Sequence, residues 1–166
     1  MRSLLLVLSL LSALCFATFD ALALDITYRR AFVRELRFII GQHPRYTWGG
    51  ATDLTKGLDC SGYVYLAGKW AGIPGIVRTT SYRMALGLDG WIGVDVPHEQ
   101  AQECDLCFWT WKKSPARING HVGVFLTRKG VLQVTHASSS RGVVLVPMRG
   151  VLRTDLSRVR RLTIGE

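Results

Sequence analysis

Apolar positions follow two different periods along this chain of 166 residues, and the period changes near residue 105. Before that point, apolar residues recur three or four positions apart, which is the spacing of one helix face. After it, short runs rich in β-branched and aromatic residues are separated by turns, which is typical of antiparallel strands. Helices followed by strands predict an α+β fold, with N-terminal helices packed on an antiparallel β-sheet.

The helical part contains three expected helices. The first begins at a cap on Thr27 and runs to about Ile40, where Gly41 and Pro44 end it. The second begins at Cys60 and ends at Gly72. A short third helix covers residues 80–86.

The strand part contains four expected strands and a fifth at an edge. Glycine-containing turns separate them and favour hairpin connections. The expected strands span residues 106–111, 121–127, 131–137 and 142–146, with residues 158–164 as the edge strand.

The first 23 residues have the pattern of a secretion signal. Arg2 precedes an apolar run, Leu4 to Phe16, that is too short to span a bilayer comfortably. Small residues at Ala21 and Ala23 predict cleavage after Ala23, which leaves residues 24–166 as a single exported domain, periplasmic or secreted. A retained N-terminal anchor helix, or lipidation at Cys15, are the alternatives.

The chain is strongly basic, with a formal net charge of +9. Removal of Arg2 and Asp20 with the signal leaves that charge unchanged. A basic surface attracts polyanions, but export argues against nucleic acid as the partner. Attraction to an anionic wall or membrane and an ordinary solvated surface both remain open, and the expected state is a monomer.

Cys60 lies where a glycine-rich loop runs into the second expected helix. A thiol on the first turn of a helix is surrounded by backbone N–H groups that have no helical partner. That setting favours thiolate over thiol and predicts a lowered pKa. The placement therefore indicates a nucleophile, although cysteine is also among the residue types most often buried in a core.

Two histidines complete a candidate triad. His121 opens one expected strand and His136 lies near the end of the next, so a hairpin brings their side chains together. Thiol catalysis needs an imidazole base and a third group that orients it. We therefore assign Cys60 as nucleophile, His121 as general base and His136 as orienting residue, and interpret His43 and His98 as surface residues.

Five short motifs occur in an order that resembles the NlpC-type cell-wall cysteine peptidases, the NlpC/p-sixty family. They are Tyr46-x-Trp48-Gly49-Gly50, Asp59-Cys60-Ser61-Gly62, Asp105-Leu106, Gly120-His121-Val122-Gly123-Val124 and His136-Ala137-Ser138. The resemblance implies a papain-like fold. It also implies hydrolysis of an amide bond in peptidoglycan stem peptides, commonly between D-glutamate and a diamino acid, with no metal or cofactor.

The resemblance also assigns roles to individual residues. Cys60, His121 and His136 take the positions of nucleophile, base and third polar residue. Tyr46 corresponds to a tyrosine that lines the site and assists the oxyanion, and Asp59 and Ser61 correspond to substrate-contacting positions. Packing for Tyr46, and helix capping for Asp59 and Ser61, are the competing interpretations.

Cys104 stands where the resembled family usually has glycine, and Cys107 follows three residues later. A short-loop disulfide between them is the favoured interpretation, because exported proteins tend to pair their cysteines. Two buried free thiols, or a redox or metal-binding pair, are the alternatives.

Other functions remain open at this stage. An amidase or an acyltransferase shares the same acyl-thioester chemistry, and a non-catalytic wall-binding module shares the fold. A thiol oxidoreductase acting through Cys104 and Cys107 is a further alternative. Four tryptophans have two open interpretations: they line a glycan or peptide groove, or they belong to the core. They are Trp48, Trp91, Trp109 and Trp111.

Overall fold

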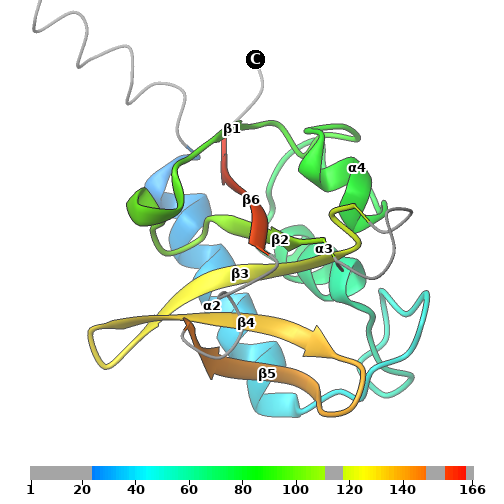
Figure 1. The fold of residues 1–166 in the computed structure, drawn as a ribbon. Helices are drawn as coiled ribbons and strands as arrows, with labels where there is room; N and C mark the ends of the chain where they lie inside the picture. Colours follow the sequence, from blue (N-terminus) through cyan, green and yellow to red (C-terminus); the bar gives the residue numbers. More distant parts are fainter. Residues whose placement is uncertain (1–23, 111–117, 149–155, 164–166) are drawn as a thin grey trace, which may run out of the picture.

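The computed structural model describes residues 24–110, 118–148 and 156–163 (Figure 1). Its helices are α2 (Ile26–Gln42), α3 (Cys60–Trp70), α4 (Ser81–Ala85) and the 3-10 turn η1 (His98–Gln100). Its strands are β1 (Gly93–Asp95), β2 (Leu106–Trp109), β3 (His121–Arg128), β4 (Val131–Ser138), β5 (Gly142–Pro147) and β6 (Leu156–Leu162). The expected signal segment and Trp111 lie outside the described residues.

The strands form one antiparallel sheet in the order β1-β6-β2-β3-β4-β5. Helices packed on an antiparallel sheet confirm the α+β prediction. The C-terminal strand was expected at an edge, and that expectation is wrong, because β6 lies between β1 and β2. The three-residue β1 was not predicted, since Gly93-Val94-Asp95 is too short to show an alternating pattern.

The main core lies between the helices and one face of the sheet. Helix α2 packs on α3 and reaches β5, while α3 packs on β3 and β4, so both helices lie on the same side of the sheet in Figure 1. Leu106 and Phe108 of β2 join this core, whereas Cys107 and Trp109 join a second cluster with Phe125 of β3. This alternation places the second cluster on the other face of the sheet.

Carboxylate and hydroxyl caps fix where the helices begin. The cap of α2 is Asp25 rather than the expected Thr27, since the Asp25 carboxylate accepts the Thr27 N–H at 2.6 Å. Asp59 caps α3 by accepting the Gly62 N–H at 2.6 Å. Thr80 was expected as the first residue of the third helix and instead caps α4 with its side chain. Cys60 is therefore the first residue of α3.

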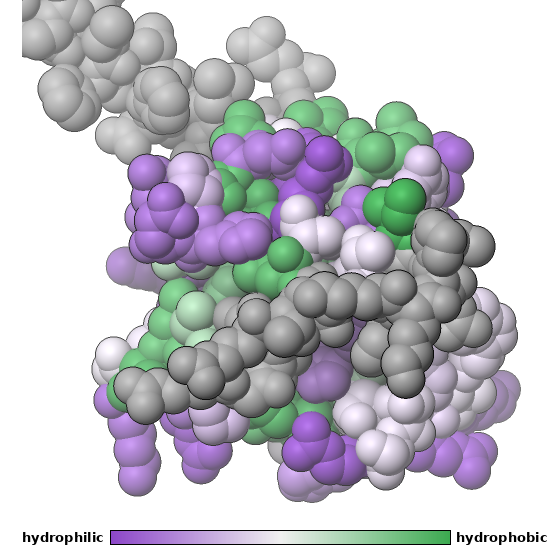
Figure 2. Space-filling view, viewed as in Figure 1, coloured by the Kyte–Doolittle hydropathy of each residue, from purple (hydrophilic) through white to green (hydrophobic). Residues whose placement is uncertain are grey.

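Part of the surface near α4 and β1 is apolar. Figure 2 shows hydrophobic residues over the top of the molecule, where Figure 1 places these two elements. The exposed apolar side chains there are Leu86, Leu88, Ile92 and Val94. No helix among the described residues is long and apolar enough to cross a membrane.

Candidate active site

The loop before Cys60 is packed directly against the first turn of α3. A Cβ on Gly62 would lie 1.9 Å from the carbonyl oxygen of Gly50, which only glycine avoids. The Asp59 N–H donates to the same Gly50 oxygen at 2.9 Å. The glycine-rich motif therefore lets the loop backbone touch the helix and fixes the position of Cys60.

Asp59 and Ser61, on either side of Cys60, are buried in a polar network. The Asp59 carboxylate accepts the N–H groups of Gly49 and Gly62 and the hydroxyl of Ser61. Arg78 donates to Asp59 at 2.7 Å and to the Ser61 Oγ at 2.8 Å. The Asp59 contacts match its capping interpretation, whereas the Ser61 hydroxyl bonds to the side chains of Asp59 and Arg78 rather than to a backbone N–H. Sequence reasoning missed Arg78, because no motif or spacing connects it to Cys60.

The two candidate histidines lie side by side. His136 pairs with Gly123 across the β3–β4 ladder, so His121 is its diagonal neighbour. The Nε2 of His121 and the Nδ1 of His136 are 2.8 Å apart, and the ring centroids are separated by 5.0 Å. The hairpin thus brings the rings together as the spacing predicts.

The Trp109 ring packs beside both histidines, and its centroid lies 5.2 Å from the His121 ring centroid and 6.0 Å from that of His136. Glycine at position 123 permits this packing, because a Cβ there would lie 2.9 Å from the Trp109 ring. The sequence is compatible with Trp109 either in a ligand groove or in the core. The structure places it in the second apolar cluster, in contact with the candidate site.

Cys60 lies next to the strand that carries His121. The backbone N–H of Val122, the residue after His121, hydrogen-bonds to the Cys60 thiol. The thiol is 6% exposed and lies at the edge of the main core. The nucleophile candidate and the base candidate therefore come from adjoining ends of α3 and β3.

The expected lowering of the Cys60 pKa is wrong for the resting structure. Burial raises the pKa of the Cys60 thiol to about 11, and the negative charge of Asp59 adds to that effect. The N–H groups of Val122, Ser61 and Cys60 itself act in the opposite direction without overcoming burial. The helix-start argument correctly identified the N–H donors but could not include the desolvation of the sulfur.

Both imidazoles are neutral at pH 7. Burial lowers the pKa of His121 to about 3, and the neighbouring His136 lowers it further. Burial likewise lowers the pKa of His136 to about 4, with a contribution from the positive charge of Arg141. The resting site therefore combines a neutral thiol with two neutral histidines.

The hydrogen bond between the rings restricts which nitrogen can act as a base. Because Nε2 of His121 is engaged with His136, a proton exchanged with a nucleophile has to pass through Nδ1 of His121. Nδ1 can accept a proton only if Nε2–H donates to His136 Nδ1. His136 then carries its own proton on Nε2, an atom that is buried without a hydrogen-bond partner among the described residues.

The remaining candidates differ in how deeply they are buried. Tyr46 is half-buried, forms a parallel bridge with Leu58 and packs against the main core. Trp48 is 86% exposed on the next turn of the loop, whereas Trp91 is fully buried. His43 and His98 are exposed, as predicted.

The structure contradicts the favoured disulfide between Cys104 and Cys107. Both thiols are free and buried, and they belong to different apolar clusters on the two faces of the sheet. Cys104 donates to the Arg29 carbonyl, with 3.6 Å between sulfur and oxygen. Among the described residues, no three His, Cys, Asp or Glu side chains come together as a candidate metal site.

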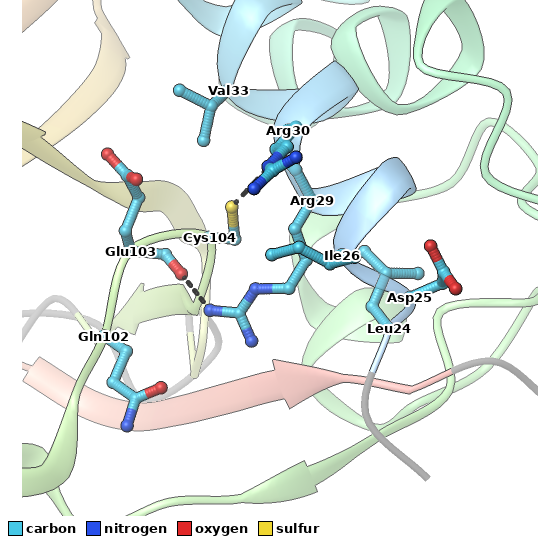
Figure 3. Close-up of a pocket in the computed structure, with 9 residues that line it drawn as sticks. All are labelled: Leu24, Asp25, Ile26, Arg29, Arg30, Val33, Gln102, Glu103 and Cys104. Atoms are coloured by element: carbon cyan, nitrogen blue, oxygen red, sulfur yellow. Dashed lines mark hydrogen bonds between the residues drawn. The ribbon is translucent and has the colours of Figure 1, made fainter. Parts of the chain in front are cut away.

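A cavity of about 620 Å³ lies away from the candidate triad, at the start of α2 (Figure 3). Figure 3 shows Arg29 crossing it to the Glu103 carbonyl, with Cys104 beside the helix. Cys104 lines this cavity, whereas Cys60, His121 and His136 do not.

Comparison with known proteins identifies the class of protein that this fold and site define. The family model described as the NlpC/P60 family matches residues 42–161. The chain therefore belongs to the NlpC/P60 family, which confirms the resemblance predicted from the motifs. No curated protein matches the chain in sequence.

Solved structures that share the fold include the following three. An NLP/P60-family protein described as similar to lipoprotein, from Staphylococcus aureus, has a TM-score of 0.61 at 23% identity. That match covers 87% of this chain and 44% of the staphylococcal chain, so this chain spans less than half of its length. The P60 domain of an antigen from M. avium paratuberculosis has a TM-score of 0.51 at 19% identity, covering 80% of this chain and 96% of that domain.

The third structure is RipD from Mycobacterium tuberculosis, with a TM-score of 0.56 at 18% identity, covering 82% of this chain and 98% of RipD. It is described as a non-catalytic NlpC/p60 domain protein adapted to peptidoglycan binding. At these identities the three structures support the fold alone.

Proposed function

We propose that this protein is an exported cysteine peptidase that hydrolyses an amide bond in peptidoglycan stem peptides. Cys60 is the nucleophile, His121 the general base and His136 the residue that orients it. The observation that carries the proposal is the 2.8 Å contact between His121 Nε2 and His136 Nδ1. The residue after His121, Val122, donates its backbone N–H to the Cys60 thiol. Membership of the NlpC/P60 family supports the wall substrate.

The reaction begins from a neutral thiol and a neutral imidazole. His121 removes the thiol proton through Nδ1 as the Cys60 sulfur attacks the scissile carbonyl carbon. The backbone N–H of Cys60, at the start of α3, faces the developing oxyanion. One such donor contributes about 100-fold or more to the rate.

The tetrahedral intermediate then collapses to an acyl-thioester. The C–N bond breaks, and the His121 imidazolium gives its proton to the leaving amine. His121 next deprotonates a water molecule that attacks the thioester, which releases the carboxylic acid and restores the thiol. Because the imidazoles begin neutral, His121 acts as a general base during attack rather than as half of a preformed ion pair.

The bond between D-glutamate and a diamino acid is the proposed point of cleavage. Tyr46 is proposed to line the cleft. Asp59 and Ser61 are proposed to act at the substrate subsite mainly by holding the Cys60 turn, since their polar atoms are already engaged. An amidase or acyltransferase uses the same thioester and differs only in the amide cleaved or in the acceptor.

A non-catalytic wall-binding function is the second candidate. The observation that favours it is the buried thiol, whose pKa is raised to about 11, together with the fold shared with RipD. Retention of Cys60, His121 and His136, with the Val122 N–H bonded to the thiol, favours catalysis instead.

The test is to incubate the protein without residues 1–23, with its cysteines kept reduced, with soluble peptidoglycan fragments. Mass spectrometry of the products is expected to show cleaved stem peptides and to identify the amide bond. Fragments that stay intact while they bind to the folded protein would support the wall-binding function and count against hydrolysis.

A further inference from the structure

Arg78 connects the two residues that flank the nucleophile. Its Nη2 donates to the Asp59 Oδ2 at 2.7 Å, and its Nη1 donates to the Ser61 Oγ at 2.8 Å. Nη1 also donates to the Thr79 carbonyl of its own segment. A single guanidinium thus ties the segment before α4 to both sides of Cys60, with the planar fork that arginine provides.

The same contacts place an ion pair beside a buried sulfur. The Asp59 side chain is 8% exposed and that of Arg78 is 30% exposed, so water screens their charges poorly. The Asp59 carboxylate disfavours the thiolate of Cys60. The Arg78 guanidinium bound to that carboxylate carries the opposite charge. Asp59 and Arg78 together form a neutral pair next to Cys60, and burial keeps His121 and His136 uncharged at neutral pH.

We propose that Arg78 is a positioning residue for the Cys60 nucleophile: it clamps Asp59 and Ser61 around the thiol and neutralises the carboxylate next to it. This inference rests on the proposed function for its biological meaning, but it concerns the thiol itself. It can therefore be tested without any substrate.

Alkylation of Cys60 by iodoacetamide provides the test, because only the thiolate reacts and the reagent is uncharged. The full-length protein is alkylated between pH 7.5 and about pH 9.5, and the rate at Cys60 is followed by peptide mass mapping. Below the thiol pKa, a change of one pKa unit changes this rate about tenfold.

Arg78→Met leaves the Asp59 carboxylate without its cation and is expected to slow alkylation about tenfold at each pH. Asp59→Asn keeps an acceptor for the helix cap but leaves Arg78 positive, so alkylation is expected to become about tenfold faster. Arg78→Lys restores the charge without the fork and is expected to stay within about threefold of the parent.

Arg161→Met is the matched control. Arg161 binds the buried carboxylate of Asp105 through two nitrogens, at 3.0 and 2.9 Å, and neither residue contacts Cys60. This variant loses the same kind of ion pair and is expected to keep the parental alkylation rate at Cys60.

A folded Arg78→Met variant that reacts at the parental rate overturns the proposal, and so does an Asp59→Asn variant that is not accelerated. If circular dichroism shows that Arg78→Met does not fold, the Asp59→Asn result decides alone.

If the parent hydrolyses no peptidoglycan, the proposed function fails, while the alkylation rates still test the role of Arg78. If it does hydrolyse, Arg78→Met is expected to lower kcat rather than raise KM.

Discussion

At the scale of single residues, the candidate site depends on where protons are held. Burial keeps Cys60 and both histidines neutral, and the contact between the rings directs any proton exchange of His121 through Nδ1. The residue types of this site were predictable from sequence, because a cysteine at a helix start and two histidines on one hairpin carry a spatial meaning. The protonation states were not, because they depend on how much water reaches each atom.

The role of His136 as a proton acceptor can be separated from its role in packing. His136→Leu removes the acceptor for His121 Nε2–H and is expected to lower kcat about 100-fold or more, because His121 loses its productive tautomer. His136→Asn supplies a carbonyl oxygen and is expected to recover most of the loss. Peptidoglycan cleavage assays measure both variants, and equal activity in the two would contradict the orienting role.

At the scale of elements, the site depends on contact between the glycine-rich loop and the first turn of α3. The sequence located α3, its cap residue and the hairpin of β3 and β4, since periodicity and turn residues are local signals. It did not locate β1, the internal position of β6 or the contacts of Arg78. Each of these depends on pairing between segments far apart in the chain, for which a single sequence carries no local signal.

Gly62→Ala tests this loop–helix contact. The added Cβ would lie 1.9 Å from the Gly50 oxygen, so the loop has to move and unfolding is expected to become easier by about 3 kcal/mol. Gly41→Ala in α2 is the matched control, since a Cβ there meets nothing within 4 Å and is expected to stabilise by about 0.5–1 kcal/mol. Urea unfolding measures both variants, and a Gly62→Ala protein as stable as the parent would show that the close contact is absent.

At the scale of the whole molecule, the sheet carries apolar clusters on both faces, and Cys104 and Cys107 belong to one each. The favoured disulfide failed because sequence spacing does not show which face of the sheet a side chain occupies. Burial raises the pKa of Cys104 to about 12 and that of Cys107 well above its usual value, so both are neutral core groups. The overall fold class was predictable because the two hydrophobic periods occupy separate halves of the chain.

The neutral histidines make the stability of the whole molecule depend on pH. Their pKa values are lowered on folding, so the unfolded chain binds protons that the folded protein does not between about pH 6.5 and pH 4. Stability therefore falls on acidification across this window, by up to about 2.7 kcal/mol per pH unit if both histidines contribute. Urea unfolding at pH 7, 6 and about 5 measures this slope.

His136→Gln is expected to reduce that slope by about half, because one of the two protons is no longer taken up on unfolding. His98→Gln is the control, since His98 is exposed in the folded protein and its removal is expected to leave the slope unchanged. A parental slope that is flat between pH 7 and about pH 5 would contradict the burial of both neutral rings.

Cleavage of stem peptides by the Cys60→Ala and Cys104→Ser variants tests whether Cys60 is the nucleophile. Both cysteines are buried and free, but the Cys60 thiol accepts the N–H of Val122, the residue after His121, whereas the Cys104 thiol donates to the Arg29 carbonyl. Cys60→Ala is expected to abolish cleavage, whereas Cys104→Ser is expected to keep it. Cleavage by a folded Cys60→Ala protein at the parental rate, or its loss only in Cys104→Ser, would contradict the account.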